Sequence, residues 1–302
     1  MQAAVLRKET VRVGFIGLGL MGSRLAQRLH GSGWSVQAWN RSAEPRQKAS
    51  QEGIAIAESA PGLAANSDVL LSCLADDAAV RSVYLGDESI LQAAQPGTIL
   101  LEMSTISPEL SLQIHRQAAE RGVSMLDAPI AGSTPAVEAG TITLLVGGDR
   151  DTFNQCTPLF ESIAKQWFLI GPAGSGIRMK LVVNLLLGVE MLAIAESISL
   201  GQHLGIDREV LLDVLPKTAV APPAFLGKFA KIRNSDYSPE FPLRLMSKDL
   251  NLALAAASST GTESSVISAA QQIFAAAIKA NGDLDLSAIT PVVEGWNTPS
   301  RT

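Results

Sequence analysis

Residues 11–29 read VRVGFIGLGLMGSRLAQRL, and this stretch decides how the N-terminal half folds. An apolar run at 11–16 ends in the turn Gly17-Leu18-Gly19-Leu20-Met21-Gly22, and apolar residues at helical spacing follow at once. The first glycine permits a tight turn, the second lets the backbone approach a pyrophosphate, and the third lets the helix pack closely on the strand. The helix N-terminus then faces the phosphates. The stretch therefore predicts a dinucleotide-binding turn, with residues 17–22 against the cofactor.

The composition describes a globular protein of about two domains, because 47% of the 302 residues are apolar and 18% are charged. The net charge of -5, without a cluster of Lys and Arg, argues against a nucleic-acid partner. Cys73 and Cys156 lie in separate segments, so we expect buried, reduced thiols and no metal site. The first ten residues lack the apolar core of a secretory signal, and we expect a cytoplasmic protein.

The N-terminal half alternates strand-like runs with helical patterns up to residue 171, which predicts an α/β domain with a Rossmann-type, doubly wound sheet. We expect strands at 11–16, 36–39, 69–74, 98–103, 124–130, 142–146 and 167–170. The segment 127–140 is rich in Gly, Pro, Ser and Ala, and we expect it to form an irregular functional loop.

The C-terminal half contains no further strand-like run, which predicts an all-helical domain. We therefore divide the chain into a cofactor-binding domain at 1–171 and a substrate and dimerisation domain at 172–302, joined through a long interdomain helix at 177–204. That helix would be about 42 Å long. Its most apolar part, 181–195, is interrupted by polar residues and shorter than the ~20 residues needed to span a bilayer, so we expect a buried helix and no membrane partner.

The same helix predicts self-association, because it carries apolar residues on nearly every face through Leu192. One domain alone would struggle to cover it, so we expect a homodimer or a dimer of dimers. The final stretch, 290–302, contains two prolines and a glycine, and we expect a loose tail or an arm on a partner.

The residues after the second expected strand select the nicotinamide cofactor. An NAD-selective site would place Asp or Glu there against the ribose hydroxyls, but this chain has Asn40-Arg41-Ser42. A carboxylate would repel a 2′-phosphate, whereas Arg41 and Ser42 can donate to one. The trio predicts NADP (NADPH), although a solvated arginine in a turn is the simpler alternative.

Lys180 and Asn184 are four residues apart, so an ammonium and an amide share one face of the long helix. Burying Lys180 among Met179, Leu181 and Val182 is costly unless it has a purpose, and desolvation lowers the pKa of a lysine. That is how a lysine becomes an acid near neutral pH. The alternative is a lysine at a helix edge whose ammonium reaches water.

Four separated motifs carry a family resemblance: GFIGLGLMG at 14–22, DAPIAGS at 127–133, GSGIRMKLVVN at 174–184 and FPLRLMSKD at 241–249. Together they resemble the β-hydroxyacid dehydrogenase family, whose members include 3-hydroxyisobutyrate dehydrogenases. The likeness is closer to its NADPH-dependent glyoxylate and succinic semialdehyde reductase branch. It extends from residue 11 to about residue 290.

The resemblance implies hydride transfer between the nicotinamide and a small carbonyl or hydroxy-acid substrate, with Lys180 as the catalytic proton donor. Asn184 would support Lys180 and the substrate, and Phe241 and Asp249 would belong to the substrate site. The implied cofactor contacts beyond the glycine turn are Leu74, Ala75, Thr105 and Lys248. Backbone amides of Gly132 and Ser133 would hold the substrate carboxylate.

One position departs from the branch, because Ala131 stands where a serine is usual. A missing hydroxyl donor would weaken binding of a carboxylate by roughly 1.5–3 kcal/mol, which makes larger or less acidic carbonyls possible substrates. Two alternatives stay open: reduction of ketones or imines on the same scaffold, and a non-catalytic NADPH-binding dimer. A 6-phosphogluconate dehydrogenase is not expected, because the chain is too short for the large helical domain of that enzyme and has no evident second phosphate clamp.

Two further groups of polar residues receive a structural interpretation. We expect His30, His115 and His203 to lie at the surface or at helix ends, away from every motif. Of Asp76 and Asp77, we expect one to cap the helix that follows.

Overall fold

The computed structural model describes residues 5–296, and the chain divides after Leu181 into two compact units. The division falls inside the long helix α10 (Ser175–His203), so the first turns of this helix belong to the first unit and the rest to the second.

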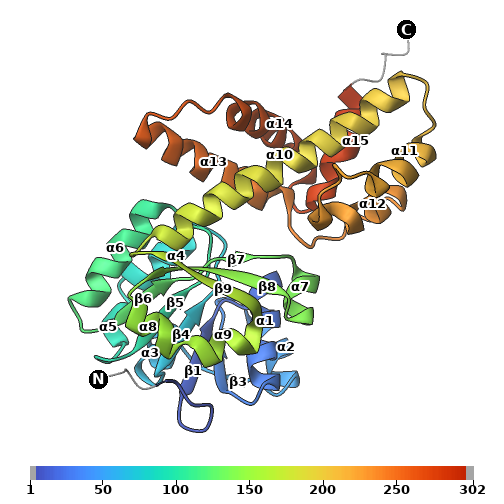
Figure 1. Ribbon diagram of the computed structural model, residues 1–302. Coiled ribbons are helices and arrows are strands. Elements are labelled where there is room, and N and C mark those ends of the chain that lie inside the picture. Colours follow the sequence, from blue (N-terminus) through green and yellow to red (C-terminus); the bar gives the residue numbers. More distant parts are fainter. Residues whose placement is uncertain (1–4, 297–302) are drawn as a thin grey trace. The chain divides into compact units, whose positions relative to one another are not determined.

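The first unit is built on one sheet with the order β3-β2-β1-β4-β5-β6-β8-β7, and β9 pairs with β8 (Figure 1). Its parallel part comprises β1 (Arg12–Ile16), β2 (Ser35–Trp39), β3 (Ala55–Ile56), β4 (Val69–Ser72), β5 (Ile99–Glu102) and β6 (Ser124–Asp127). The rest comprises β7 (Ile130–Ala131), β8 (Ile142–Gly148) and β9 (Ala164–Gly171); β8 pairs antiparallel with β6 and β7 and parallel with β9. Because β1 pairs with both β2 and β4, the strand order reverses there, which is where such sheets bind ligands. The predicted doubly wound α/β architecture is confirmed.

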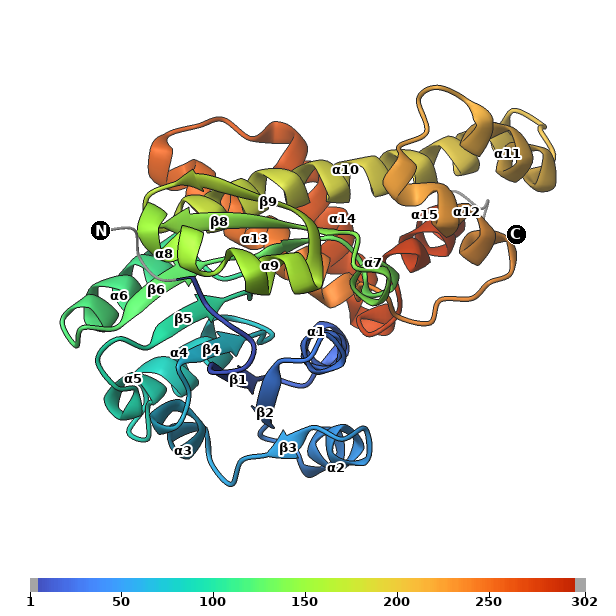
Figure 2. The same ribbon diagram turned by 60° about the horizontal axis from the view of Figure 1, so that its bottom comes forward.

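Helices cover both faces of the sheet (Figure 2). The helices of this unit are α1 (Leu20–Gly31), α2 (Ala43–Gln51), α3 (Ala60–Ala65), α4 (Asp77–Leu85), α5 (Ile90–Ala93), α6 (Pro108–Ala119), α7 (Thr134–Ala139), α8 (Arg150–Gln155) and α9 (Thr157–Ile163). Successive strand residues enter opposite cores: Phe15 packs with side chains of α1 and α9, and Ile16 with side chains of α3, α4 and α6. Both faces are buried, which explains the continuous apolar runs.

The expected irregular loop at 127–140 is wrong in part. The expected strand 124–130 splits, because β6 ends at Asp127 and Pro129, which lacks an N–H, precedes the two-residue β7. β7 pairs antiparallel with β8, and α7 follows with Ser133 at its N-cap and proline in its first turn. Ser-Thr-Pro is a helix-start signal that the Gly- and Ala-rich composition obscured. The short strand β3 was also not expected.

The second unit is helical, as expected. After α10 it contains α11 (Arg208–Val214), α12 (Leu226–Arg233), α13 (Leu243–Thr260), α14 (Ser265–Asn281) and α15 (Ile289–Trp296), with short 3₁₀ turns between them. Helices α13 and α14 pack against each other. The expected loose tail at 290–302 is wrong as far as residue 296, since α15 buries Ile289, Thr290 and Val293; residues 297–302 lie outside the described part.

Helix α10 is long and apolar enough to cross a membrane by length and composition alone. Buried residues make up 39% of its most apolar stretch, and core helices of globular proteins meet the same two criteria. The expectation of a buried helix is therefore only partly met within one chain, because Val182 and Leu186 are exposed.

Candidate active site

The glycine turn between β1 and α1 has the geometry of a phosphate-binding loop. Gly17 has a φ of +94°, and a Cβ there would lie 2.3 Å from the carbonyl oxygen of Cys73. At Gly22 a Cβ would lie 1.9 Å from the Gly17 carbonyl oxygen, whereas at Gly19 it would meet no atom within 4 Å. Gly19 is the N-cap of α1 and has no side chain to occupy the first N–H groups. The turn therefore fits a pyrophosphate at the helix N-terminus.

Asn40 braces this turn from the end of β2. Its Oδ1 accepts a hydrogen bond from Leu18 N at 3.0 Å, and its Nδ2 donates to the Ser42 carbonyl at 3.3 Å. Leu18 is buried, so it contributes to the shape of the turn through its packing and this hydrogen bond. Arg41 and Ser42 are exposed beside the turn. Asn40 thus has a positioning role that sequence reasoning did not find.

The loops after β4 and β5 are tied together next to the turn. Leu74 N donates to Ser104 Oγ at 2.8 Å, Leu74 and Thr105 are half-buried, and Ala75 is exposed. The expected helix cap is confirmed: Asp76 Oδ1 accepts from Ala79 N at 2.9 Å. Gly17 approaches both Cys73 and Leu74, so the loop after β4 lies against the predicted cofactor turn, and the loop after β5 is joined to it through Ser104.

Behind these loops lies a buried carboxyl that sequence reasoning missed. Glu102 accepts from Ser104 N at 2.5 Å and from Ser72 Oγ at 2.8 Å, and Ser72 Oγ lies 2.6 Å from Tyr84 Oη. Burial raises the pKa of Glu102 to about 7, although the hydrogen bonds from Ser104 and Ser72 oppose the shift. The available signal was an acidic residue ending an otherwise apolar strand.

The expectation for His115 is wrong. His30 and His203 do lie in the last turns of α1 and α10, but the ring of His115 is mostly buried and its Nε2 lies 3.0 Å from Asp127 Oδ1. Asp127 opens the predicted substrate loop, so His115 contacts a motif from 12 residues away. Within that loop Ala131 and Ser133 are half-buried and Gly132 is exposed.

Lys180 and Asn184 lie one turn apart on α10, and both are buried, with exposed fractions of 8% and 1%. This burial disfavours the alternative of a lysine at a helix edge. Asn184 Nδ2 donates to Asp249 Oδ2 at 2.5 Å, and Lys248 Nζ lies 3.0 Å from Asp249 Oδ1. Asn184 Oδ1 is buried and has no hydrogen-bond partner in the part of the chain that is described, so it can accept from a ligand.

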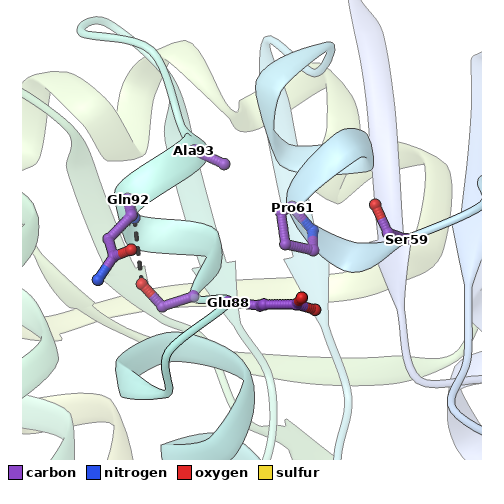
Figure 3. A pocket seen from close by; sticks show the side chains of 6 residues that line it. Ser59, Pro61, Glu88, Gln92 and Ala93 are labelled. Carbon is purple, nitrogen blue, oxygen red and sulfur yellow. Dashed lines mark hydrogen bonds between the residues drawn. The ribbon is translucent and has the colours of Figure 1, made fainter.

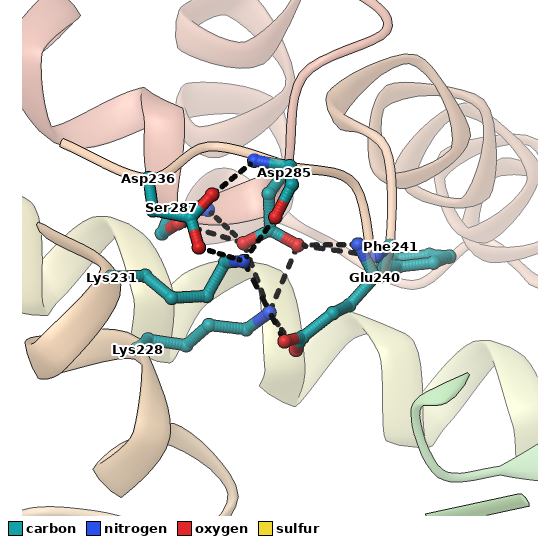
Figure 4. A network of polar contacts seen from close by, with 8 residues as sticks. Lys228, Lys231, Asp236, Glu240, Phe241, Asp285 and Ser287 are labelled. Atoms are coloured by element: carbon teal, nitrogen blue, oxygen red, sulfur yellow. Dashed lines mark hydrogen bonds and ion pairs between the residues drawn. The ribbon is translucent and has the colours of Figure 1, made fainter. Parts of the chain in front are cut away.

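The Phe241 backbone is fixed by a buried ion-pair network (Figure 4). Asp285 Oδ2 accepts from Phe241 N at 3.2 Å and from Glu240 N at 3.0 Å, and Lys228 Nζ lies 2.9 Å from the same carboxylate. Lys228 also donates to Glu240 Oε2 at 2.7 Å. Burial alone would raise the pKa of Asp285, but the charge and hydrogen bonds of Lys228 and Ser287 outweigh it and lower the pKa. Phe241, Glu240 and Lys228 lie 44 to 57 residues before Asp285, and no sequence motif signalled these contacts.

The hollow between α3 and α5 contributes nothing to this site. It has a volume of about 400 Å³ and is lined by Ser59, Pro61, Glu88, Ser89, Gln92 and Ala93, none of which is a predicted site residue (Figure 3). Among residues 5–296, no group of three or more His, Cys, Asp or Glu could hold a metal ion. The thiol of Cys156 is buried and that of Cys73 is half-buried, and neither forms a disulfide.

Comparison with known protein families assigns both halves of the chain. Residues 12–171 match the family described as the NAD binding domain of 6-phosphogluconate dehydrogenase. Residues 174–293 match the family described as NAD-binding of NADP-dependent 3-hydroxyisobutyrate dehydrogenase.

Individual proteins are similar over nearly the whole chain. Glyoxylate/succinic semialdehyde reductase 1 of Arabidopsis thaliana is 32% identical over 94% of this chain and 99% of its own length. The 3-hydroxyisobutyrate dehydrogenase of Mycobacterium tuberculosis, solved with L-serine, is 31% identical over 95% of this chain and 99% of its own, with a TM-score of 0.82. Psf3 in complex with NADP+ and 2-OPP is 26% identical, covers 93% of this chain and 99% of its own, and has a TM-score of 0.86. The chain spans about half the length of the nuclear factor N-PAC, which it also matches.

Proposed function

The chain belongs to the β-hydroxyacid dehydrogenase family of oxidoreductases that act on CH–OH groups, and we propose that it is an NADPH-dependent reductase of small carboxylate-bearing aldehydes such as glyoxylate or succinic semialdehyde. One observation carries the proposal. Lys180 is buried one helical turn from Asn184, whose amide is oriented by Asp249 and whose Oδ1 is free to accept from a ligand.

When bound at the glycine turn, a nicotinamide cofactor would supply the hydride that reduces the carbonyl carbon. Lys180 donates a proton from Nζ to the carbonyl oxygen as negative charge builds there, and becomes neutral. Asn184 holds the substrate beside this ammonium. Oxidation of the hydroxy acid needs neutral Lys180 as the base, so reduction is favoured at lower pH and the reverse reaction at higher pH.

The choice of NADPH is supported by the exposed Arg41 and Ser42 beside the glycine turn and by the likeness to a protein solved with NADP+. Arg41 offers donors to a 2′-phosphate where a carboxylate would repel it. Arg41→Asp should lower kcat/KM for NADPH relative to NADH by about tenfold or more. Lys48→Asp, which removes an exposed cation from α2, is the matched control. An unchanged NADPH:NADH ratio in Arg41→Asp would contradict the proposal.

Substrate binding is proposed to use backbone amides of Gly132 and Ser133 for the carboxylate. Ala131 removes the hydroxyl that the branch usually offers there, so this chain should favour carbonyl acids larger than glyoxylate. Ala131→Ser should raise kcat/KM for glyoxylate by about tenfold, because a hydrogen bond to a charged group contributes about 1.5–3 kcal/mol. No gain in Ala131→Ser would exclude this explanation of selectivity.

The deciding experiment follows NADPH oxidation with glyoxylate, succinic semialdehyde, tartronate semialdehyde, simple ketones and a cyclic imine. We expect the highest kcat/KM on an aldehyde that carries a carboxylate. Turnover confined to ketones or imines would favour the alternative of a ketone or imine reductase on the same scaffold. NADPH binding without turnover of any substrate would favour the non-catalytic dimer.

The proposal includes a homodimer or a dimer of dimers in the cytoplasm. Val182 and Leu186, one turn apart on α10, are exposed at 62% and 59%, and a second copy would remove this apolar surface from water. Light scattering of the purified protein should give a multiple of 31.8 kDa. Leu186→Glu should shift the mass toward that of one chain, and a monomeric wild type would contradict the assembly.

A further inference from the structure

We propose that Asp127 is a positioning residue that holds the first turn of α10, and with it Lys180, in register with the segment that carries Gly132 and Ser133. The inference rests on the proposed function for the role of Lys180. All the contacts that carry it lie within the first unit, between β6, α6, β8 and the start of α10.

The carboxylate of Asp127 caps α10 from a distant part of the chain. Gly174 N donates to Oδ1 at 2.8 Å, and Ile177 N donates to Oδ2 at 2.9 Å. Gly174 immediately precedes the helix and has no side chain that could accept these N–H groups itself. Asp127, 47 residues earlier, therefore supplies the anion that a helix N-terminus favours.

The surrounding backbone leaves room for this carboxylate at two glycines. A Cβ at Gly147 on β8 would lie 2.6 Å from Asp127 Oδ1, and a Cβ at Gly176 on α10 would lie 2.9 Å from Oδ2. A Cβ at Gly176 would also lie 2.3 Å from the carbonyl oxygen of Leu145. The backbones of α10 and β8 therefore approach the Asp127 carboxylate closely, with no side chain between them. The start of α10 cannot shift without breaking the hydrogen bonds from Gly174 N and Ile177 N.

His115 supplies the third contact. Its Nε2 lies 3.0 Å from Asp127 Oδ1, and its side chain is 11% exposed. It lines a groove of about 830 Å³ together with Arg116 on α6 and Asp149 before α8. Replacing His115 removes one contact and leaves both backbone N–H bonds, so its effect should be smaller than that of replacing Asp127.

The contacts of Asp127 matter for catalysis because Asp127 is linked to both sides of the proposed site: to Lys180 through the first turn of α10, and to Gly132 and Ser133 through β7. Lys180 follows Ile177 by three residues, so the position of the first turn sets the position of the ammonium. In the other direction, the chain runs from Asp127 through β7 to Gly132 and Ser133. A misplacement of 1 Å between reacting groups can reduce a rate by about 10²-fold.

The test compares Asp127→Asn with a matched cap. An asparagine side chain has only one oxygen, so its NH₂ group would face one of the two backbone N–H groups that donate to Asp127, and that hydrogen bond would be lost. Because the first turn of α10 would then shift, kcat for the best aldehyde should fall by about 10²-fold. The dissociation constant of NADPH should change by less than about threefold. Amide hydrogen exchange at residues 174–181, measured without substrate, should accelerate. The control is Asp207→Asn, since Asp207 accepts from Glu209 N at 2.8 Å and Val210 N at 3.3 Å at the start of α11. It should leave kcat and this exchange at the wild-type level.

Each outcome decides the inference. Equal kcat in the two variants, or unchanged exchange at 174–181 in Asp127→Asn, would overturn it. A wild type that reduces no carbonyl acid would instead refute the proposed function, while the exchange experiment would still test the anchor. If Asp127→Asn does not fold, His115→Phe should lower kcat by about tenfold and His115→Gln should recover part of the loss; wild-type activity in His115→Phe would overturn the inference.

Discussion

Glu102 in the first unit and Asp285 in the second are both completely buried carboxyls, and their surroundings are opposite. Glu102 has a serine hydroxyl and a backbone N–H as donors, and burial raises its pKa to about 7. Asp285 faces Lys228, which lowers its pKa in spite of burial. Around Glu102 the first unit orients its loops with neutral groups and backbone N–H donors, whereas the second unit orients Phe241 with a charge pair. Mutation of Asp285 should therefore lower the free energy of unfolding through loss of a charge pair, whereas mutation of Glu102 should change how that free energy depends on pH.

Breaking the charge pair should give the largest loss of stability. Asp285→Ala leaves Lys228 buried without its main partner and removes the acceptor of the Glu240 and Phe241 N–H groups. We expect the free energy of unfolding to fall by about 3–5 kcal/mol in urea titrations. The control is Asp283→Ala, because Asp283 forms an exposed pair with Arg244 that should contribute less than about 1 kcal/mol. Equal losses would contradict the contrast between the buried and exposed pairs.

Glu102→Gln tests whether the uncharged surroundings of Glu102 make the stability of the protein depend on pH. In the folded state Glu102 keeps its proton up to about pH 7, whereas in the unfolded chain it has its usual pKa of 4.5. The protonated carboxyl therefore contributes its full stabilisation below pH 4.5, and this contribution is lost as the pH rises through 7. The loss should reach at most about 3 kcal/mol. The variant keeps a neutral group, so its stability relative to the wild type should rise between pH 5 and pH 7.5. Asp149→Asn is the control, because the pKa of Asp149 is lowered. A difference between Glu102→Gln and wild type that does not change with pH would refute this account.

Gly19→Ala tests the glycine turn of the first unit, and it should have the smallest effect of these substitutions. A Cβ there meets no protein atom within 4 Å, so the melting temperature should not fall. It would occupy the space proposed for the pyrophosphate, so the dissociation constant of NADPH should rise at least about tenfold, or about 1.4 kcal/mol. Gly31→Ala, at the other end of α1 and equally unobstructed, should bind NADPH like the wild type. Normal binding in Gly19→Ala would show that the space is not needed.

The same contrast explains what the sequence could predict. The glycine turn, the alternating strands and the face shared by Lys180 and Asn184 are local patterns set by backbone periodicity, and the structure contains the expected elements. The segment 127–140 was misinterpreted because its composition is that of a loop, although it contains β7 and α7. Composition averages over a window, whereas strand pairing and helix caps depend on single residues.

The contacts that the sequence did not reveal join residues far apart in the chain. His115 meets Asp127, Asp127 meets the start of α10, and Lys228 meets Asp285 only after folding. In the sequence alone, His115, Lys228 and Asp285 resemble ordinary surface residues, and Asp127 is only the first residue of the expected substrate loop. One sequence carries no signal that pairs them, so the positioning groups behind the site emerge only from the structure.

The most direct test of the central claim is single-turnover reduction of the best carbonyl acid by Lys180→Ala with saturating NADPH. The account predicts that the rate falls by about 10²–10⁴-fold while the dissociation constant of NADPH stays within about threefold of the wild type. Reduction at the wild-type rate, with the cofactor bound normally, would contradict the assignment of Lys180 as the proton donor.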